Sequence, residues 1–196
     1  MGTGRLEAFS DGVIAIIITI MVLELKAPEG HSIAALVPMA PVFLSYVLSF
    51  VYVGIYWNNH HHMLHTCEEV SGGILWANLH LLFWLSLIPF ATAWLGENHF
   101  SSGPAALYGA ILLLSAIAYV ILQQQIIKSQ RGKRDILAEA IGDDFKGKVS
   151  VLMYVAGIGA SFWQPRISLM LYGLTAVIWF IPDRRIEKVV KSETGN

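Results

Sequence analysis

After four residues the chain reads Arg5-Leu6-Glu7-Ala8-Phe9-Ser10-Asp11, followed directly by Gly12-Val13-Ile14-Ala15-Ile16-Ile17-Ile18-Thr19-Ile20-Met21-Val22-Leu23. The second part is almost entirely apolar but too short to cross a bilayer alone, since a spanning helix needs about 20 apolar residues. A helix that spans here must therefore carry its charged part partly into the membrane. Ionisable groups at that depth are costly and usually face protein or water. We therefore expect this helix to line a water-filled pathway.

The composition is typical of a membrane protein. Of the 196 residues, 55% are hydrophobic and only 14% are charged, and the mean hydropathy is +0.58. A soluble domain has about 25% charged residues. The net charge of −1 gives no reason to expect a nucleic-acid partner, and a single cysteine, Cys67, excludes a disulfide within the chain. We therefore predict an all-α, multi-pass protein of the cell membrane.

Six apolar segments predict six transmembrane helices in a single domain that covers residues 1–196. The predicted spans are about 5–25, 32–57, 74–95, 104–127, 149–163 and 167–182. The last two are short for a span, so a re-entrant hairpin made of these two segments is the alternative. More spans follow the first helix, and no small-residue cleavage site comes after it, which favours a retained helix over a signal peptide.

The distribution of basic residues predicts the orientation. With the amino terminus in the cytoplasm, eleven of the 13 Lys and Arg residues fall on the cytoplasmic side, and only Lys26 and Arg166 fall outside. The positive-inside rule therefore predicts that both termini are cytoplasmic. Four tryptophans lie near predicted span ends, as expected for interfacial anchors: Trp57, Trp76, Trp94 and Trp163.

Four histidines follow the second predicted span: His60, His61, His62 and His65. His61 and His65 are one helical turn apart, and two imidazoles in this arrangement can share a zinc ion. Glu68 and Glu69 are candidates to complete such a site. Because this ligand pattern is loose, we favour the simpler interpretation of polar histidines at a helix end, with no metal.

One stripe of the first helix contains Gly12, Ile16, Ile20 and Leu23, with Thr19 at its edge, given 100° per residue. One helix cannot enclose a pathway. If this stripe faces water, several copies must surround an axis, with closed cyclic symmetry as the default. A ring of Ile16 would then form an apolar constriction, which gates ions by excluding water. The alternative is that the apolar residues of this stripe are ordinary core residues, as apolar stripes usually are.

The pattern Arg5-x-x-x-Phe9-Ser10-Asp11 before an isoleucine-rich run resembles the signature of the transmembrane protein 175 family. The likeness continues in Tyr56-Trp57-x-x-His60, Asn78-Leu79-His80-Leu81-Leu82-Phe83, Ile88-Pro89-Phe90 and Pro182-Asp183-Arg184-Arg185. Members of this family are potassium-permeable channels of endosomes and lysosomes, with shorter prokaryotic relatives. This chain has one six-span unit and so resembles the prokaryotic members, which assemble as tetramers.

The resemblance also implies roles for individual residues. In that family the first helix lines the pore, and its narrowest point lies five positions after the signature aspartate, which is Ile16 here. Further apolar pore layers would fall on Ile20 and Leu23, and Thr19 matches a threonine implicated in potassium preference. The signature residues hold helices together at the cytoplasmic end. This implies a network of Arg5, Phe9, Ser10 and Asp11, with Asn78 or His80 as partners.

The leading hypothesis is a homotetrameric channel in the lipid bilayer for potassium and other monovalent cations. It is not an enzyme and needs no cofactor or metal. The Thr-Val-Gly-Tyr-Gly carbonyl filter of ordinary potassium channels is absent, so selectivity needs another basis. A secondary transporter, proton- or ion-coupled, is the alternative, although Asn78 and His80 are its only candidate binding residues and no repeat is seen. A membrane scaffold or enzyme is the third class and the least favoured, because no soluble active-site domain is found.

Overall fold

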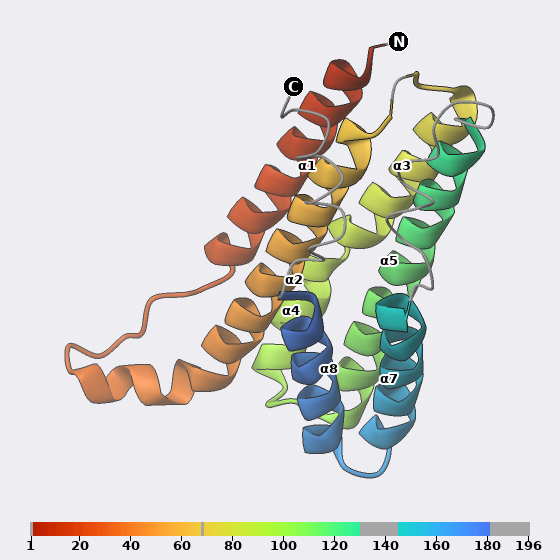
Figure 1. Cartoon of the computed structure of the whole chain (residues 1–196). Helices are drawn as coiled ribbons and strands as arrows, with labels where there is room; N and C mark the ends of the chain where they lie inside the picture. Colours follow the sequence, from red (N-terminus) through yellow and green to blue (C-terminus); the bar gives the residue numbers. More distant parts are fainter. Residues whose placement is uncertain (1, 68, 130–144, 181–196) are drawn as a thin grey trace.

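The computed structural model describes residues 2–67, 69–129 and 145–180, and within these ranges every regular element is helical (Figure 1). The elements are α1 (Thr3–Leu23), a 3₁₀ helix η1 (Ile33–Met39), α2 (Ala40–His65), α3 (Gly72–Ser86), α4 (Ile88–Glu97), α5 (Ser102–Ser129), α7 (Phe145–Ser161) and α8 (Pro165–Phe180). Each of the six predicted spans corresponds to one helix or to two consecutive helices. The prediction of an all-α membrane protein is therefore confirmed.

Within the described part of the chain, four helical segments are long and apolar enough to cross a membrane: Thr3–Leu23, Ile33–His65, Gly72–Glu97 and Ser102–Ser129. Helices α7 and α8 are shorter, with 17 and 16 residues, which corresponds to about 25 Å of helix against a hydrocarbon core of about 30 Å. Both pack on α5, toward the end of the bundle opposite the N-terminus (Figure 1). The Pro182–Arg185 motif lies outside the described residues.

The second and third spans differ in detail from the prediction. Helix α2 continues to His65, eight residues past the predicted end, because the polar residues that end the apolar run do not break a helix. The third span is interrupted at Leu87 between α3 and α4. Pro89 causes the break, because it has no N–H to donate and its ring clashes with the carbonyl one turn earlier. Proline is tolerated in the first turn of the new helix α4.

Helix α1 lies at one side of the bundle and packs on α2, α3 and α4 (Figure 1). Its buried positions follow a helical spacing of three or four residues: Leu6, Ser10, Ile14, Ile17 and Met21. This spacing places them on one face. The face that packs on the rest of the chain is therefore distinct from the stripe with Ile16.

Tyrosine side chains form the centre of the bundle where α2, α5, α7 and α8 meet. The Tyr52 hydroxyl donates to the Tyr172 carbonyl (2.6 Å), and the Tyr172 hydroxyl donates to the Ala105 carbonyl (3.2 Å). Gly109 and Gly157 pack directly against the Tyr172 ring. These hydrogen bonds satisfy the buried hydroxyls, and the glycines let α5 and α7 approach α8 closely.

Candidate functional site

Three buried polar side chains join α1, α2 and α3 near the end where α1 begins. The Ser10 hydroxyl donates to the Leu6 carbonyl (2.8 Å), and the Asn78 amide donates to the Ser10 oxygen (3.0 Å). The Asn78 carbonyl oxygen lies 2.7 Å from Nε2 of His60. All three polar side chains are almost completely buried. Buried polar groups in an apolar environment need such partners, so the network fixes how α1 packs on α2 and α3.

The directions of these hydrogen bonds define the state of His60. Ser10 has one hydroxyl proton and donates it to Leu6, so it accepts from Asn78. The amide oxygen of Asn78 then faces His60 and can only accept, so Nε2 of His60 carries the proton. Nδ1 of His60 is buried and has no hydrogen-bond partner among the described residues. A proton on Nδ1 would therefore be unsatisfied, and we infer a neutral imidazole.

A second set of contacts joins the more exposed edges of α1 and α2 at the same end. The Trp57 indole donates to the Asp11 carboxylate (3.0 Å), and Nδ1 of His61 lies 2.7 Å from a carboxylate oxygen of Glu7. From the first contact to the second, the contacting residue lies four positions earlier on α1 and four positions later on α2. This is the spacing of one turn on two antiparallel helices. The pair of contacts therefore sets the register of α1 against α2.

The predicted pore stripe lies outside the core of the chain. Ile16 is 59% exposed, Ile20 is 42% exposed and Leu23 is 74% exposed. By contrast, Ile17 is only 3% exposed. The alternative interpretation, in which these three apolar residues belong to an ordinary core, is therefore wrong for the single chain. The stripe is available to a second molecule, to lipid or to a pathway.

Thr19 lies beside this stripe and is exposed. Its hydroxyl donates to the Ala15 carbonyl one turn earlier (2.9 Å). Because the proton is held by the backbone, the oxygen presents lone pairs away from the helix. The Thr19 side chain can therefore accept a hydrogen bond or bind a cation.

The two candidate partners in the third span, Asn78 and His80, make different contacts. Asn78 binds Ser10, whereas His80 accepts a hydrogen bond from the Trp84 indole within α3 (2.9 Å). Of the other signature residues, Asp11 pairs with Trp57. Arg5 and Phe9 are exposed, and Arg5 makes no ion pair with the residues that the structure describes.

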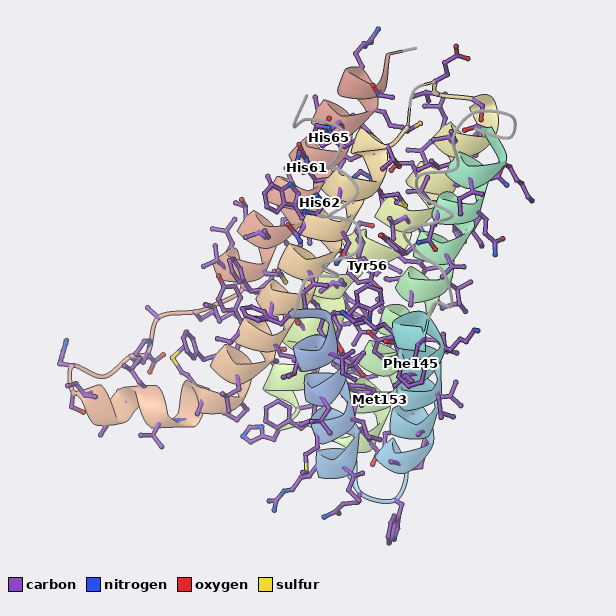
Figure 2. The ribbon with its side chains drawn as sticks, in the orientation of Figure 1. Tyr56, His61, His62, His65, Phe145 and Met153 are labelled. Carbon is purple, nitrogen blue, oxygen red and sulfur yellow. The ribbon has the colours of Figure 1, made fainter. Side chains whose placement is uncertain are left out.

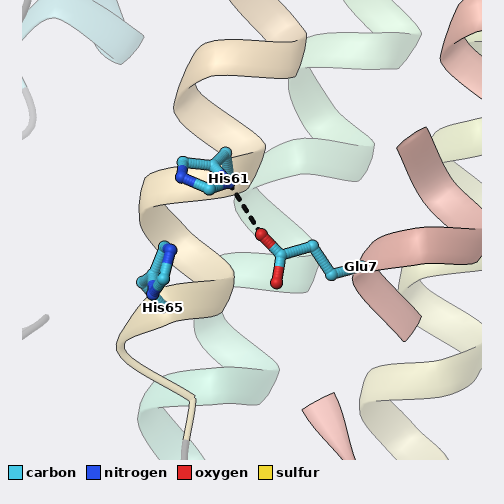
Figure 3. Close-up of side chains that lie close together, drawn as sticks. All are labelled: Glu7, His61 and His65. Carbon is cyan, nitrogen blue, oxygen red and sulfur yellow. Dashed lines mark ion pairs between the residues drawn. The ribbon is translucent and has the colours of Figure 1, made fainter. Parts of the chain in front are cut away.

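Two participants were not identified from the sequence, namely Glu7 and the indole of Trp57. One feature of the sequence could have identified them. Glu7 and Asp11 are four residues apart on one helix, and Trp57 and His61 have the same spacing on the next. Figure 2 shows His61, His62 and His65 on α2 beside α1. Among the described residues, the carboxylate that lies with His61 and His65 is that of Glu7 and not that of Glu69 (Figure 3). Glu68 lies outside the described residues.

Together these features define a multi-pass helical membrane protein whose first helix is fastened at one end and presents an apolar face outward. The model of the family described as "Endosomal/lysosomal potassium channel TMEM175" matches residues 5–89. This range contains the network and the stripe.

Similar proteins extend this match over most of the chain. A potassium channel of Chryseobacterium sp. (strain P1-3) is 60% identical over 191 residues, covering 97% of this chain and 99% of that protein. A potassium channel of Streptomyces collinus is 30% identical, covering 90% and 91%. The crystal structure of a lysosomal potassium-selective channel TMEM175 homolog from Chamaesiphon minutus superposes with a TM-score of 0.79 at 28% identity, covering 92% of this chain and 97% of that one. This chain belongs to the TMEM175 family.

Proposed function

We propose that this chain forms a potassium-permeable cation channel in which four copies place α1 around a central pore. The observation that carries the proposal is the exposed stripe of Ile16, Ile20 and Leu23 on a helix whose opposite side is packed in the chain. The names of the relatives support a potassium channel. They also favour a channel over a secondary transporter.

The rest of the exposed surface of α1 suits contact between copies. Ala8, Gly12 and Ala15 are exposed and follow one another at helical spacing next to the bulky stripe. Small residues let membrane helices approach closely. Neighbouring α1 helices in contact through this small-residue stripe would direct the adjacent bulky side chains toward the shared axis.

In this arrangement the bulky stripe forms the gate. Ile16 and Ile20 lie about 6 Å apart along the helix axis, and Leu23 extends the apolar region to about 10 Å. An apolar constriction of this kind blocks ions when it excludes water. Opening requires that the rings widen, and therefore that α1 moves relative to its neighbours.

Thr19 supplies the polar groups of the pore. Its hydroxyl proton is held by Ala15, so a ring of Thr19 oxygens would offer lone pairs to a passing cation. Potassium is favoured over sodium because it loses its water at lower cost. The contacts of Ser10 and Asp11 hold the inner end of α1, so the gate region moves against a fixed support.

We also propose that the protein lies in the cell membrane with both termini in the cytoplasm. The beginning of α1, with Arg5, and the end of α5, with Lys128, lie at the same end of the bundle (Figure 1). Lys26 lies beyond the other end of α1 and is 4.0 Å from Glu97 of α4. The positive-inside rule then places the first of these ends in the cytoplasm.

Substitution of the constriction tests the proposal. Ile16→Asn is expected to raise potassium flux into liposomes that contain the purified protein, because a polar ring holds water in the neck. Leu174→Asn is the matched control, since Leu174 is 53% exposed on α8. Flux that is unchanged in Ile16→Asn, or raised equally in both variants, would remove Ile16 from the constriction. Counter-ion-coupled, saturating flux would instead support the transporter.

Cross-linking tests the position of the stripe directly. In a Cys67→Ser background, which removes the only native cysteine, Ile16→Cys is expected to form disulfide-linked dimers of the chain upon mild oxidation. Leu174→Cys should remain monomeric on a denaturing gel. Native mass spectrometry should show four copies. Failure of Ile16→Cys to link subunits would contradict a shared axis lined by α1.

A further inference from the structure

Glu7, His61 and His65 bring three potential metal ligands together between α1 and α2. One ligand atom from each lies within 4.8 Å of the other two. His61 and His65 are one turn apart on α2, with ring centroids 4.5 Å apart, and Glu7 reaches them from α1 (Figure 3). Two different helices therefore contribute the set, and Glu7 and His61 are 54 positions apart in the sequence.

Two imidazoles and one carboxylate are the donor set that zinc and similar transition metals prefer. With metal–ligand distances of about 2.0–2.2 Å, tetrahedral ligands lie about 3.3 Å from one another. Glu7 and His61 are already closer than this, at 2.7 Å, so a metal would replace the proton that they share. His65 would approach by side-chain rotation, which is open to it because it is exposed.

The surroundings suit a bound ion. The side chains of His61 and Glu7 are 37% and 25% exposed, so an ion can enter from the solvent and retain a water as its fourth ligand. The His61 ring is stacked on Trp57, and Trp57 is itself held by Asp11. One ligand is thus oriented before binding, which lowers the cost of assembling the site.

We propose that Glu7, His61 and His65 form a binding site for a zinc-class transition-metal ion that ties the beginning of α1 to the end of α2. Calcium and magnesium are excluded by the two imidazole ligands, because these ions prefer oxygen. The ion would reinforce the same junction that Trp57 and Asp11 make one turn further along. The binding itself does not depend on the proposed channel function.

Calorimetry on the purified full-length protein tests the site. The protein is prepared without a polyhistidine tag and in the Cys67→Ser background, and it is titrated with ZnCl₂ and, separately, MgCl₂. We expect one zinc ion per chain and no magnesium binding. His65→Ala and Glu7→Gln should each weaken zinc binding at least about tenfold, since even outer-shell changes cost that much. His99→Ala, at the far end of α4, should bind as the parent does.

Thermal unfolding gives a second readout. Zinc should raise the unfolding temperature of the parent and of His99→Ala, because a ligand that binds the folded form stabilises it. At the same zinc concentration the unfolding temperature of His65→Ala should rise by less. Absence of zinc binding, or equal affinity in the parent, His65→Ala and Glu7→Gln, would overturn the proposal. Because no flux is measured, failure here leaves the channel proposal standing, and a failed channel proposal leaves the metal site standing.

Discussion

The hydrogen bond between Asn78 and Ser10 predicts a measurable coupling between α1 and α3. A double-mutant cycle of Ser10→Ala, Asn78→Ala and the combined variant isolates this bond. Both side chains are fully buried, and the bond is 3.0 Å long. Loss of the bond would free the N-terminal half of α1 from α3, so the cycle measures how firmly this helix is fastened.

The expected magnitude follows from the number of bonds that each substitution removes. Hydrogen bonds between membrane helices contribute about 0.6 kcal/mol on average and at most about 1.7 kcal/mol. Asn78→Ala removes two such bonds, to Ser10 and to His60. It also leaves both ring nitrogens of His60 without a partner. The free energy of unfolding should therefore fall by about 1–3 kcal/mol.

Ser10→Ala removes one bond between helices and the donation to Leu6, which lies within α1. Its effect should be smaller than that of Asn78→Ala. The coupling energy between the two substitutions should be about 0.6–1.7 kcal/mol, the range for one bond. Coupling of this size exceeds the additivity error of about 0.3–0.5 kcal/mol for independent sites.

Reversible unfolding in mixed detergent and SDS micelles, at a fixed protein concentration, measures these free energies. Asn98→Ala paired with Ser10→Ala is the control cycle, because the exposed Asn98 side chain, at the C-cap of α4, has no hydrogen bond to another helix among the described residues and donates to the Trp94 carbonyl. That cycle should show no coupling. Additive effects of Ser10→Ala and Asn78→Ala would refute the reasoning that this bond ties the two helices together.

Much of the fold could be predicted from the sequence because membrane spans are long apolar runs. The end of α2 was not predictable in this way, because the length of an apolar run reflects the thickness of the bilayer core and not the length of the helix. Residues Asn58 to His65 are polar or mixed and remain helical beyond it. The break at Leu87 has a visible cause in Pro89, but its position depends on the packing of α3 and α4.

The buried side of a membrane helix is harder to predict than its existence. In α3 the exposed residues Trp76, Leu79 and Phe83 are as apolar as the buried Leu81 and Leu85. Because lipid accepts apolar side chains as readily as the protein interior does, the hydrophobic pattern does not mark one face. The sequence therefore could not decide between Asn78 and His80, which lie two residues apart and point in different directions.

The contact between Glu7 and His61 required the packing of two helices. Local sequence suggested Glu68 and Glu69 as partners for the histidines, because they are close along the chain. The antiparallel register of α1 and α2 brings Glu7 against His61. For the same reason the pore stripe was ambiguous: only the packing of Ile17 and Met21 into the chain reveals that Ile16 is left outside.

Two further predictions concern packing away from the stripe. Burial raises the pKa of the Cys67 thiol, so little thiolate is present at neutral pH. N-ethylmaleimide should therefore modify Cys67 slowly in the folded protein, faster as the pH is raised, and rapidly in SDS. Mass spectrometry follows the extent of modification. A Cβ atom at Gly157 would collide with the Tyr172 ring, whereas one at Gly159 meets nothing within 4 Å. In the same unfolding assay, Gly157→Ala should therefore cost about 1–3 kcal/mol, and Gly159→Ala should be neutral or stabilising by up to about 1 kcal/mol, since alanine favours the helix. Equal effects of the two substitutions on α7 would mean that its close approach to Tyr172 does not hold α7 against α8.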